Sequence, residues 1–128
     1  MNHVILVVDD ERDFLESVKR ALVVSGYKNI RLLDDPLEAA ELVEEGEHYD
    51  VALLDISMSG MTGVELLERI KMFSPTTECI MLSALHEISL VVECFQKGAL
   101  DYLVKPFSRE ALVLRVERAL EQKHVRDS

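Results

Sequence analysis

The chain has 128 residues, a length that fits one domain with its own hydrophobic core. Hydrophobic residues make up 48% and charged residues 30%, and no apolar run approaches the roughly 20 residues of a membrane-spanning helix. The formal net charge of −10 disfavours direct binding to nucleic acid, because such binding depends on neutralising phosphates with lysine and arginine. We therefore expect a soluble domain that binds neither nucleic acid nor a membrane directly.

The first apolar stretch and the cysteines both indicate a cytoplasmic protein. Val4 to Val8 has the length of a strand, and neither a basic leader nor a small-residue cleavage site accompanies it, so it is not a signal peptide. Cys79 and Cys94, the only cysteines, lie in apolar runs and form no CxxC motif. We expect two buried thiols in a reducing compartment.

Five strand-like runs alternate with five helix-length segments along the chain. The strands are predicted at Val4–Val8, Asn29–Leu33, Val51–Leu54, Glu78–Leu82 and Asp101–Val104. The helices are predicted near 11–25, 36–45, 63–72, 86–97 and 108–122. The first and third strands are apolar throughout, which is typical of parallel strands buried on both faces. This alternation predicts a doubly wound α/β domain with right-handed crossovers.

Local signals support these helix boundaries. Asp35 and Pro36 provide an N-cap and a first-turn proline, and Thr62 with Glu65 forms a capping box. Ser108 is placed to cap the last helix. Glycines stand where three of the helices should end: Gly26, Gly46 and Gly98.

Polar residues follow four of the five predicted strands. Asp9 and Asp10 follow the first strand and Asp55 the third, while Ser83 follows the fourth and Lys105 the fifth. A parallel α/β sheet forms its site beyond the carboxyl ends of its strands, so these side chains should converge. Three adjacent carboxylates repel one another and need positive charge, which Lys105 and a hard cation such as Mg²⁺ would supply. The pattern predicts an acidic Mg²⁺ pocket around a nucleophilic carboxylate.

From Val4 to Leu120 the chain resembles the receiver domain of bacterial two-component response regulators. The matching segments are Leu6–Glu11, Leu53–Met58, Gly60–Gly63, Met81–Ala84 and Gly98–Phe107. The resemblance implies a flavodoxin-like (βα)5 three-layer sandwich with a parallel five-stranded sheet of order 2-1-3-4-5. It also implies a receiver domain over residues 1–122, with residues 123–128 as a polar tail or the start of a linker to an output domain.

The resemblance implies a role for each polar residue at the predicted site. Asp55 would be the phosphoacceptor, Asp10 a direct Mg²⁺ ligand, and Asp9 a ligand directly or through water. The ion would also be held by Asp55 and by the backbone carbonyl of Ser57, and Mn²⁺ would substitute for Mg²⁺. Ser83 and Lys105 would each contact a phosphoryl oxygen. Tyr102 would be the aromatic switch that moves inward when Ser83 moves. The Lys105–Pro106 peptide should be cis.

The implied function is a switch that catalyses only its own phosphorylation and dephosphorylation and is not otherwise an enzyme. The donor would be a sensor histidine kinase or a phosphotransfer protein, because no phosphodonor motif surrounds the scattered histidines His3, His48, His86 and His124. The change would pass to the face of the fourth helix, fifth strand and fifth helix, which also offers a possible homodimer contact. The expected output is transcription regulation through a downstream domain. A stand-alone receiver acting on another protein and a non-phosphorylated scaffold are alternatives.

Two other classes of α/β domain fit the sequence less well. A phosphatase with an aspartate nucleophile needs an acid/base aspartate two residues beyond it, where this chain has Ser57. A flavin-binding domain needs a Ser/Thr/Gly phosphate cradle after the first strand, and that loop is acidic here.

Two features of the sequence leave open questions. The family usually carries proline four residues after the phosphoacceptor, whereas this chain has Ser59, which should leave the loop from Asp55 to Thr62 freer. In the fourth helix, an apolar face is predicted to join the core: Ile88, Val91, Val92 and Phe95. Leu90 and Cys94 form a second stripe, which we interpret as a wider core face rather than an exposed docking patch.

Overall fold

Each strand of the chain is followed by a helix, in five consecutive units. The structure is a computed structural model that describes residues 3–84 and 88–127. The strands are β1 (Val4–Val8), β2 (Asn29–Leu33), β3 (Val51–Asp55), β4 (Glu78–Ser83) and β5 (Asp101–Val104). The helices are α1 (Arg12–Val24), α2 (Pro36–Glu44), α3 (Gly63–Phe73), α4 (Ile88–Gln96) and α5 (Arg109–Asp127). Among the described residues, no helix is both long enough and apolar enough to cross a membrane.

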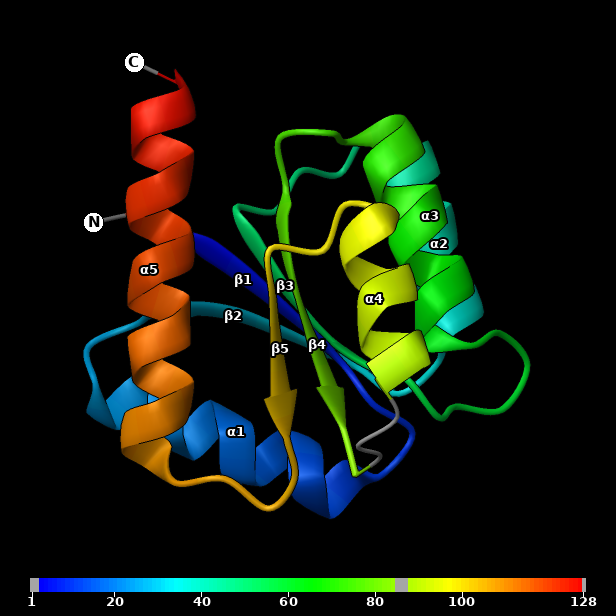
Figure 1. Cartoon of the computed structure of the whole chain (residues 1–128). Helices are drawn as coiled ribbons and strands as arrows, with labels where there is room; N and C mark the ends of the chain where they lie inside the picture. The colour runs from blue at the N-terminus through cyan, green and yellow to red at the C-terminus, as the bar shows by residue number, and fades with distance from the viewer. Residues whose placement is uncertain (1–2, 85–87, 128) are drawn as a thin grey trace.

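The five strands form one parallel sheet between two layers of helices. The strand order is β2-β1-β3-β4-β5, as the resemblance implied, and every neighbouring pair is parallel. Figure 1 shows α1 and α5 on one face of the sheet and α2, α3 and α4 on the other. The predicted doubly wound three-layer architecture is confirmed.

Alternation along the strands divides the interior into two cores. On β1, Leu6 and Val8 face the core under α2, α3 and α4, whereas Ile5 and Val7 face the core under α1 and α5. Successive side chains of a strand point to opposite faces, so a central strand covered by helices on both sides must be apolar at every position. This explains the unbroken apolar runs that identified β1 and β3.

The predicted caps are present. The Asp35 carboxylate accepts a hydrogen bond from the backbone N–H of Leu37 at 2.9 Å. Thr62 and Glu65 make the reciprocal bonds of a capping box, and the Ser108 hydroxyl accepts from the N–H of Ala111 at 3.1 Å. Three helices end at glycines with positive φ: Gly26, Gly46 and Gly98. The Lys105–Pro106 peptide is cis, as predicted.

Several element boundaries differ from the sequence prediction. The strands β3 and β4 each extend one residue further, because Asp55 pairs with Leu82 and Ser83 pairs with Val104 in the parallel ladder. The helix α5 continues to Asp127 rather than ending near residue 122. Residues 86 and 87, where the fourth helix was expected to begin, lie outside the described residues.

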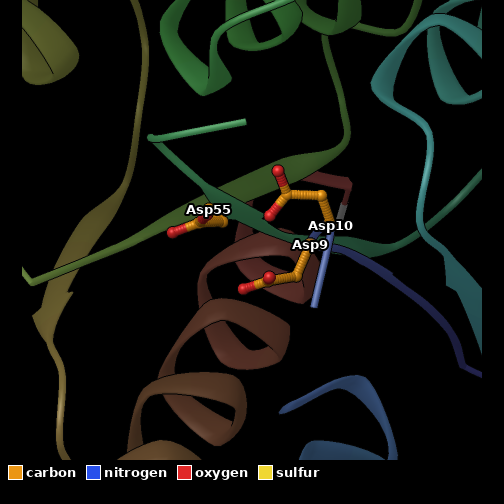
Figure 2. Close-up of side chains that lie close together, drawn as sticks. All are labelled: Asp9, Asp10 and Asp55. Carbon is orange, nitrogen blue, oxygen red and sulfur yellow. The ribbon is translucent and has the colours of Figure 1, made fainter. Parts of the chain in front are cut away.

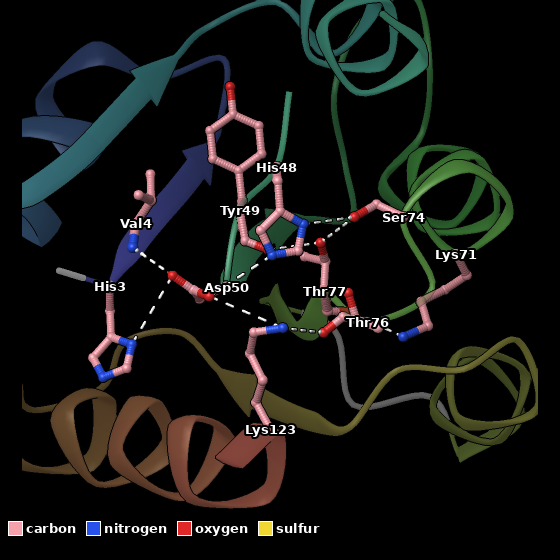
Figure 3. A network of polar contacts seen from close by, with 10 residues as sticks. All are labelled: His3, Val4, His48, Tyr49, Asp50, Lys71, Ser74, Thr76, Thr77 and Lys123. Carbon is pink, nitrogen blue, oxygen red and sulfur yellow. Dashed lines mark hydrogen bonds and ion pairs between the residues drawn. The ribbon is translucent and has the colours of Figure 1, made fainter. Parts of the chain in front are cut away.

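A polar network at the end of the sheet away from Asp55 includes Lys123, which lies in the part of α5 beyond residue 122 (Figure 3). The Asp50 carboxylate accepts from the N–H of Val4 at 2.8 Å and lies 3.9 Å from Lys123 Nζ. The same Lys123 ammonium donates to the carbonyl of Thr76 at 3.1 Å, and its side chain is buried. These contacts fix a late turn of α5 to the loop before β4 and to the start of β3.

The predicted core face of α4 was wrong for Ile88, Val92 and Phe95, whereas the interpretation of Leu90 and Cys94 as a core face is confirmed. Ile88, Val92 and Phe95 are 79%, 46% and 45% exposed, whereas Cys94 is fully buried and Leu90 packs against the core. Both apolar stripes recur with helical period, so the pattern did not identify which stripe meets the sheet. The predicted burial of both cysteine thiols is confirmed, and neither forms a disulfide.

Candidate functional site

Three aspartates meet at the carboxyl end of the sheet (Figure 2). Asp9 and Asp10 follow β1 directly, Asp55 is the last residue of β3, and the pairing of Val8 with Leu54 brings the two strand ends level. Each aspartate offers one carboxylate oxygen, and these oxygens lie within 4.8 Å of one another. Asp9 and Asp55 are buried while Asp10 is exposed. The predicted convergence of these aspartates at the carboxyl ends of the strands is confirmed.

Lys105 joins two of these carboxylates. Its Nζ lies 2.8 Å from Asp9 Oδ2 and 3.2 Å from Asp55 Oδ1. Its backbone N–H donates to the carbonyl of Ser83 at 2.8 Å, which continues the ladder between β4 and β5 beyond the last paired residues. Lys105 is therefore a fixed positive charge shared by two buried acids, as its place after β5 predicted.

An aromatic pair that sequence reasoning missed lies against this lysine. The Phe14 ring, from α1, has its centroid 3.9 Å from Lys105 Nζ, and the Phe107 ring meets it edge-on at 5.8 Å. A cation over an aromatic face is attracted by the ring quadrupole, and perpendicular rings also attract. The sequence of α1 gives no sign that Phe14 differs from an ordinary core residue. The contact between Phe14 and Lys105 is visible only in the packing of α1 near the end of β5.

The surroundings of Asp55 make its negative charge costly. Burial and the neighbouring charge of Asp9 raise the pKa of Asp55 from 3.8 to about 6, and the ammonium of Lys105 lowers it only in part. Burial by itself would lower the pKa of Lys105, but its hydrogen bond to Asp9 and the charge of Asp55 raise it above the ordinary value. The site thus has an excess of negative charge that one lysine does not balance.

The backbone supplies two further hydrogen bonds to the acidic pair. The N–H of Glu11 donates to Asp9 Oδ1 at 2.9 Å, and the N–H of Ser59 donates to Asp10 Oδ2 at 3.3 Å. Sequence reasoning found neither bond. It singled out Ser59 for the absence of a proline and not for the N–H that a serine retains.

The loop after β3 folds tightly against the end of its own strand. The N–H of Gly63 donates to the carbonyl of Ile56 at 2.9 Å, and a Cβ at Gly63 would lie 2.1 Å from the carbonyl oxygen of Asp55. Only glycine allows α3 to begin so close to the strand end. The loop from Ile56 to Thr62, which carries Ser57 and Ser59, is therefore closed at its base.

The remaining predicted residues lie at or near this end of the sheet. Ser83 is buried at the end of β4, one position beyond the residue that pairs with Asp55. Ser57 is exposed in the loop after β3. Tyr102 is half-buried in β5, paired with Met81, and packs against the core under α4. Their placement agrees with the sequence prediction.

The donor set suits a hard divalent cation. The grouped ligand atoms are carboxylate oxygens, and Mg²⁺ prefers one or two carboxylates, carbonyl oxygens and water. Thiolate or imidazole ligands, which softer metals prefer, are absent from this group of described residues. A cation bound there would also offset the excess negative charge around Asp55.

Two buried acids joined by a lysine, with a third acid beside them, at the carboxyl end of a parallel (βα)5 sheet define a doubly wound α/β domain with an acidic site that suits a cation. The model of the response regulator receiver domain matches residues 5–117, which is most of the chain. This chain belongs to the response regulator receiver domain family. Receiver domains are phosphorylation-dependent signalling domains that bind Mg²⁺ at an acidic pocket and interact with histidine kinases and output domains.

Relatives of different lengths resemble the chain. The transcriptional regulatory protein ZraR of Klebsiella oxytoca is 36% identical over 97% of this chain, which spans 28% of that protein. The chemotaxis protein CheY of Bacillus subtilis is 32% identical over 94% of this chain and 99% of its own length. A solved CheY-like receiver domain from Methanospirillum hungatei JF-1 superposes with a TM-score of 0.92 at 28% identity, covering 98% of this chain and 99% of its own.

Proposed function

We propose that Asp55 is the phosphoryl acceptor of a Mg²⁺-dependent signalling switch. The observation that supports this most strongly is the position of Asp55: a buried carboxylate, 3.2 Å from Lys105, beside two further acids at the end of the sheet. Asp9, Asp10, Asp55 and the backbone carbonyl of Ser57 would hold Mg²⁺ or Mn²⁺. When bound, the cation supplies positive charge that stabilises the charged phosphoryl oxygens.

The residues of the chain have separate tasks in the transfer. An Asp55 carboxylate oxygen attacks the phosphorus of a phosphohistidine on a partner kinase or phosphotransfer protein, forming a P–O bond as the P–N bond breaks. The electron pair of the broken bond returns to the histidine nitrogen, which leaves. Lys105 pairs with one phosphoryl oxygen and the Ser83 hydroxyl donates to another, so both stabilise charge without changing the bonds. The chain thus catalyses only its own phosphorylation and dephosphorylation; in the latter, water attacks the phosphorus of the aspartyl phosphate, its P–O bond to Asp55 breaks, and inorganic phosphate leaves.

Phosphorylation of Asp55 would change a surface of the domain that lies away from Asp55. The phosphoryl group adds about −1.5 to −2 charge and draws Lys105 and Ser83 towards it. Movement of Ser83 at the end of β4 leaves space that the Tyr102 ring can occupy, which would alter the face of α4, β5 and α5. The exposed side chains of Ile88, Val92 and Phe95 on that face make it the candidate homodimer contact.

The output of the switch depends on the protein that carries the domain. The ZraR relative favours transcription regulation through a further domain, since the chain spans only 28% of that protein. Residues 123–128 would then begin the linker, with the receiver domain over residues 1–122. The CheY relative, matched over 99% of its length, keeps a stand-alone receiver as the second candidate. The negative net charge speaks against direct nucleic-acid contact by this domain, and the two free thiols suit a cytoplasmic location.

Incubation with Mg²⁺ and acetyl phosphate, followed by intact-mass measurement, tests the proposal. The wild type should gain one phosphoryl group, and EDTA or Asp55→Asn should abolish the gain. Asp13→Asn, which changes an exposed aspartate on α1, is the matched control and should be phosphorylated like the wild type. An equal mass gain in Asp55→Asn would exclude Asp55 as the acceptor. Multiple turnover with many small phosphate esters would instead indicate a phosphatase.

A further inference from the structure

The two aspartates that follow β1 are held in different ways. The buried Asp9 is fixed by Lys105 through Oδ2 and by the N–H of Glu11 through Oδ1. Asp10 is exposed, and within residues 3–84 and 88–127 its side chain has one hydrogen bond, which it accepts from the N–H of Ser59 at 3.3 Å. The orientation of the Asp10 carboxylate therefore depends on a residue 49 positions away in the sequence.

This bond requires a residue that keeps its backbone N–H. Proline, which the family resemblance led us to expect at position 59, lacks that hydrogen and fixes φ. The donor is the backbone N–H and not the serine hydroxyl, so any residue other than proline would retain it. The bond also joins the loop after β3 to the loop after β1, and these two loops carry Ser57 and Asp10.

The bond has two physical effects on the acidic cluster. Its N–H dipole offsets part of the repulsion among three carboxylates whose oxygens lie within 4.8 Å of one another. It also restricts rotation of the one carboxylate in the cluster that burial does not fix. Second partners of this kind orient metal ligands, and their removal typically weakens metal binding about 10–100-fold.

We propose that the backbone N–H of Ser59 is a positioning group that holds the Asp10 carboxylate ready for a divalent cation. The proposal rests on the proposed Mg²⁺ site and adds a residue to it. It also gives a second consequence of the missing proline. Serine at position 59 frees the loop from the fixed φ of proline, and it also supplies the N–H that bonds the loop to Asp10, a proposed metal ligand. Because the bond is long and exposed, its effect should lie at or below the lower end of the range for such partners.

The test compares Ser59→Pro with Ser59→Ala by calorimetric titration with MgCl2 alone, without a phosphodonor. Ser59→Pro removes the N–H and should weaken Mg²⁺ binding about threefold to tenfold. Ser59→Ala removes only the hydroxyl and should leave the dissociation constant within about twofold of the wild type. Circular dichroism and urea unfolding establish that both variants are folded.

Hydrogen exchange at the Ser59 amide in metal-free protein provides a measurement that does not depend on the proline variant. Exchange should be slowed in the wild type and should speed up severalfold in Asp10→Ala, which removes the acceptor. An Asp13→Ala variant, at an exposed position on α1, should leave the exchange rate unchanged.

Three results would overturn the inference while leaving the proposed function intact. The first is Mg²⁺ binding in Ser59→Pro as tight as in the wild type, and the second is an exchange rate at Ser59 that does not respond to Asp10→Ala. Equal weakening by Ser59→Ala and Ser59→Pro would assign the effect to the hydroxyl and would also overturn it. A wild-type protein that binds no Mg²⁺ would instead refute the proposed function itself.

Discussion

At the scale of single residues, the site is defined by a charge imbalance around one buried carboxylate. Asp55 lies between the negative charges of Asp9 and Asp10 and the single positive charge of Lys105. Burial and Asp9 together outweigh the lysine, which is why the pKa of Asp55 is raised to about 6. This excess of negative charge favours the binding of a cation, and it destabilises the folded protein when no cation is bound.

Asp55→Asn should therefore stabilise the metal-free protein at neutral pH. An unfolded chain releases the Asp55 proton near pH 3.8, whereas the folded chain retains it to about pH 6. The folded state thus binds more protons between these values, and the stability contributed by Asp55 falls as pH rises through that window. Above pH 6 the penalty is fully present, and Asn should relieve about 2 kcal/mol of it.

Urea unfolding in EDTA at pH 4 and pH 7.5 measures this effect. The gain from Asp55→Asn should be small at pH 4 and largest at pH 7.5, and Mg²⁺ should reduce it, because the cation stabilises only the wild-type site. Asp13→Asn, which changes an exposed aspartate, should show neither the gain nor its pH dependence. A gain of equal size at both pH values would contradict this explanation.

At the scale of elements, the site depends on how closely α3 begins behind the end of β3. Thr62 caps α3 through a reciprocal pair of bonds with Glu65, and the next residue, Gly63, passes directly behind the carbonyl of Asp55. The capping box sets where the helix starts, and the glycine allows that start to touch the strand. The capping box was visible in the sequence as a helix signal, but the closeness of Gly63 to Asp55 was not.

Gly63→Ala should destabilise the protein by about 2–4 kcal/mol and should also slow phosphorylation of Asp55. The new Cβ would lie 2.1 Å from the Asp55 carbonyl oxygen and 2.7 Å from Ile56 Cα, so backbone atoms beside the acceptor must move. Urea unfolding and the rate of phosphorylation by acetyl phosphate measure the two effects.

Gly46→Ala provides the control for this substitution. Gly46 has a φ of +99°, so alanine is strained there, but no atom lies within 4 Å of the added Cβ. Its cost should be about 1–2 kcal/mol from backbone strain alone, with no effect on phosphorylation. If Gly63→Ala cost no more than Gly46→Ala, steric contact with the strand end would not be the reason.

At the scale of the whole molecule, the sheet separates two cores and places the site where its strands end. The core under α2, α3 and α4 is closed at α4 by Cys94 and Leu90, which leaves Ile88, Val92 and Phe95 facing outward. The apolar outer stripe of α4 therefore does not pack against the described core. Because this stripe is exposed, we propose the surface formed by α4, β5 and α5 as the homodimer contact.

Leu90→Lys and Val92→Lys separate core from surface on this helix. Leu90→Lys should reduce the free energy of unfolding by about 2 kcal/mol, because it exposes packed apolar area and buries a charge. Val92→Lys should change it by less than about 0.5 kcal/mol, since Val92 is 46% exposed. Urea unfolding compares the two, and equal losses of stability would contradict the assignment of the stripes.

The Val92→Lys variant also tests the proposed homodimer. If the phosphorylated wild type associates through the outer stripe, Val92→Lys should abolish association in sedimentation experiments while remaining folded and competent for phosphorylation. Undiminished association of Val92→Lys would place the contact on another surface.

The sequence by itself determined the number and order along the chain of the elements, their caps, and the polar residues at the strand ends. These features are local: a buried parallel strand must be apolar, and a helix start must satisfy its free N–H groups within a few residues. The convergence of Asp9, Asp55 and Lys105 also followed, because parallel strands all end at the same edge of a sheet.

Only the tertiary structure decided which stripe of α4 is buried, how charge is balanced at Asp55, and which groups hold Lys105 and Asp10. Each depends on residues far apart in the sequence, such as Asp10 and Ser59 at 49 positions or Asp9 and Lys105 at 96. Helical periodicity was equally satisfied by both stripes of α4, and no local pattern encodes a contact between Phe14 and Lys105. Packing against neighbouring elements chooses among such locally equivalent arrangements, because it alone sets burial and distance.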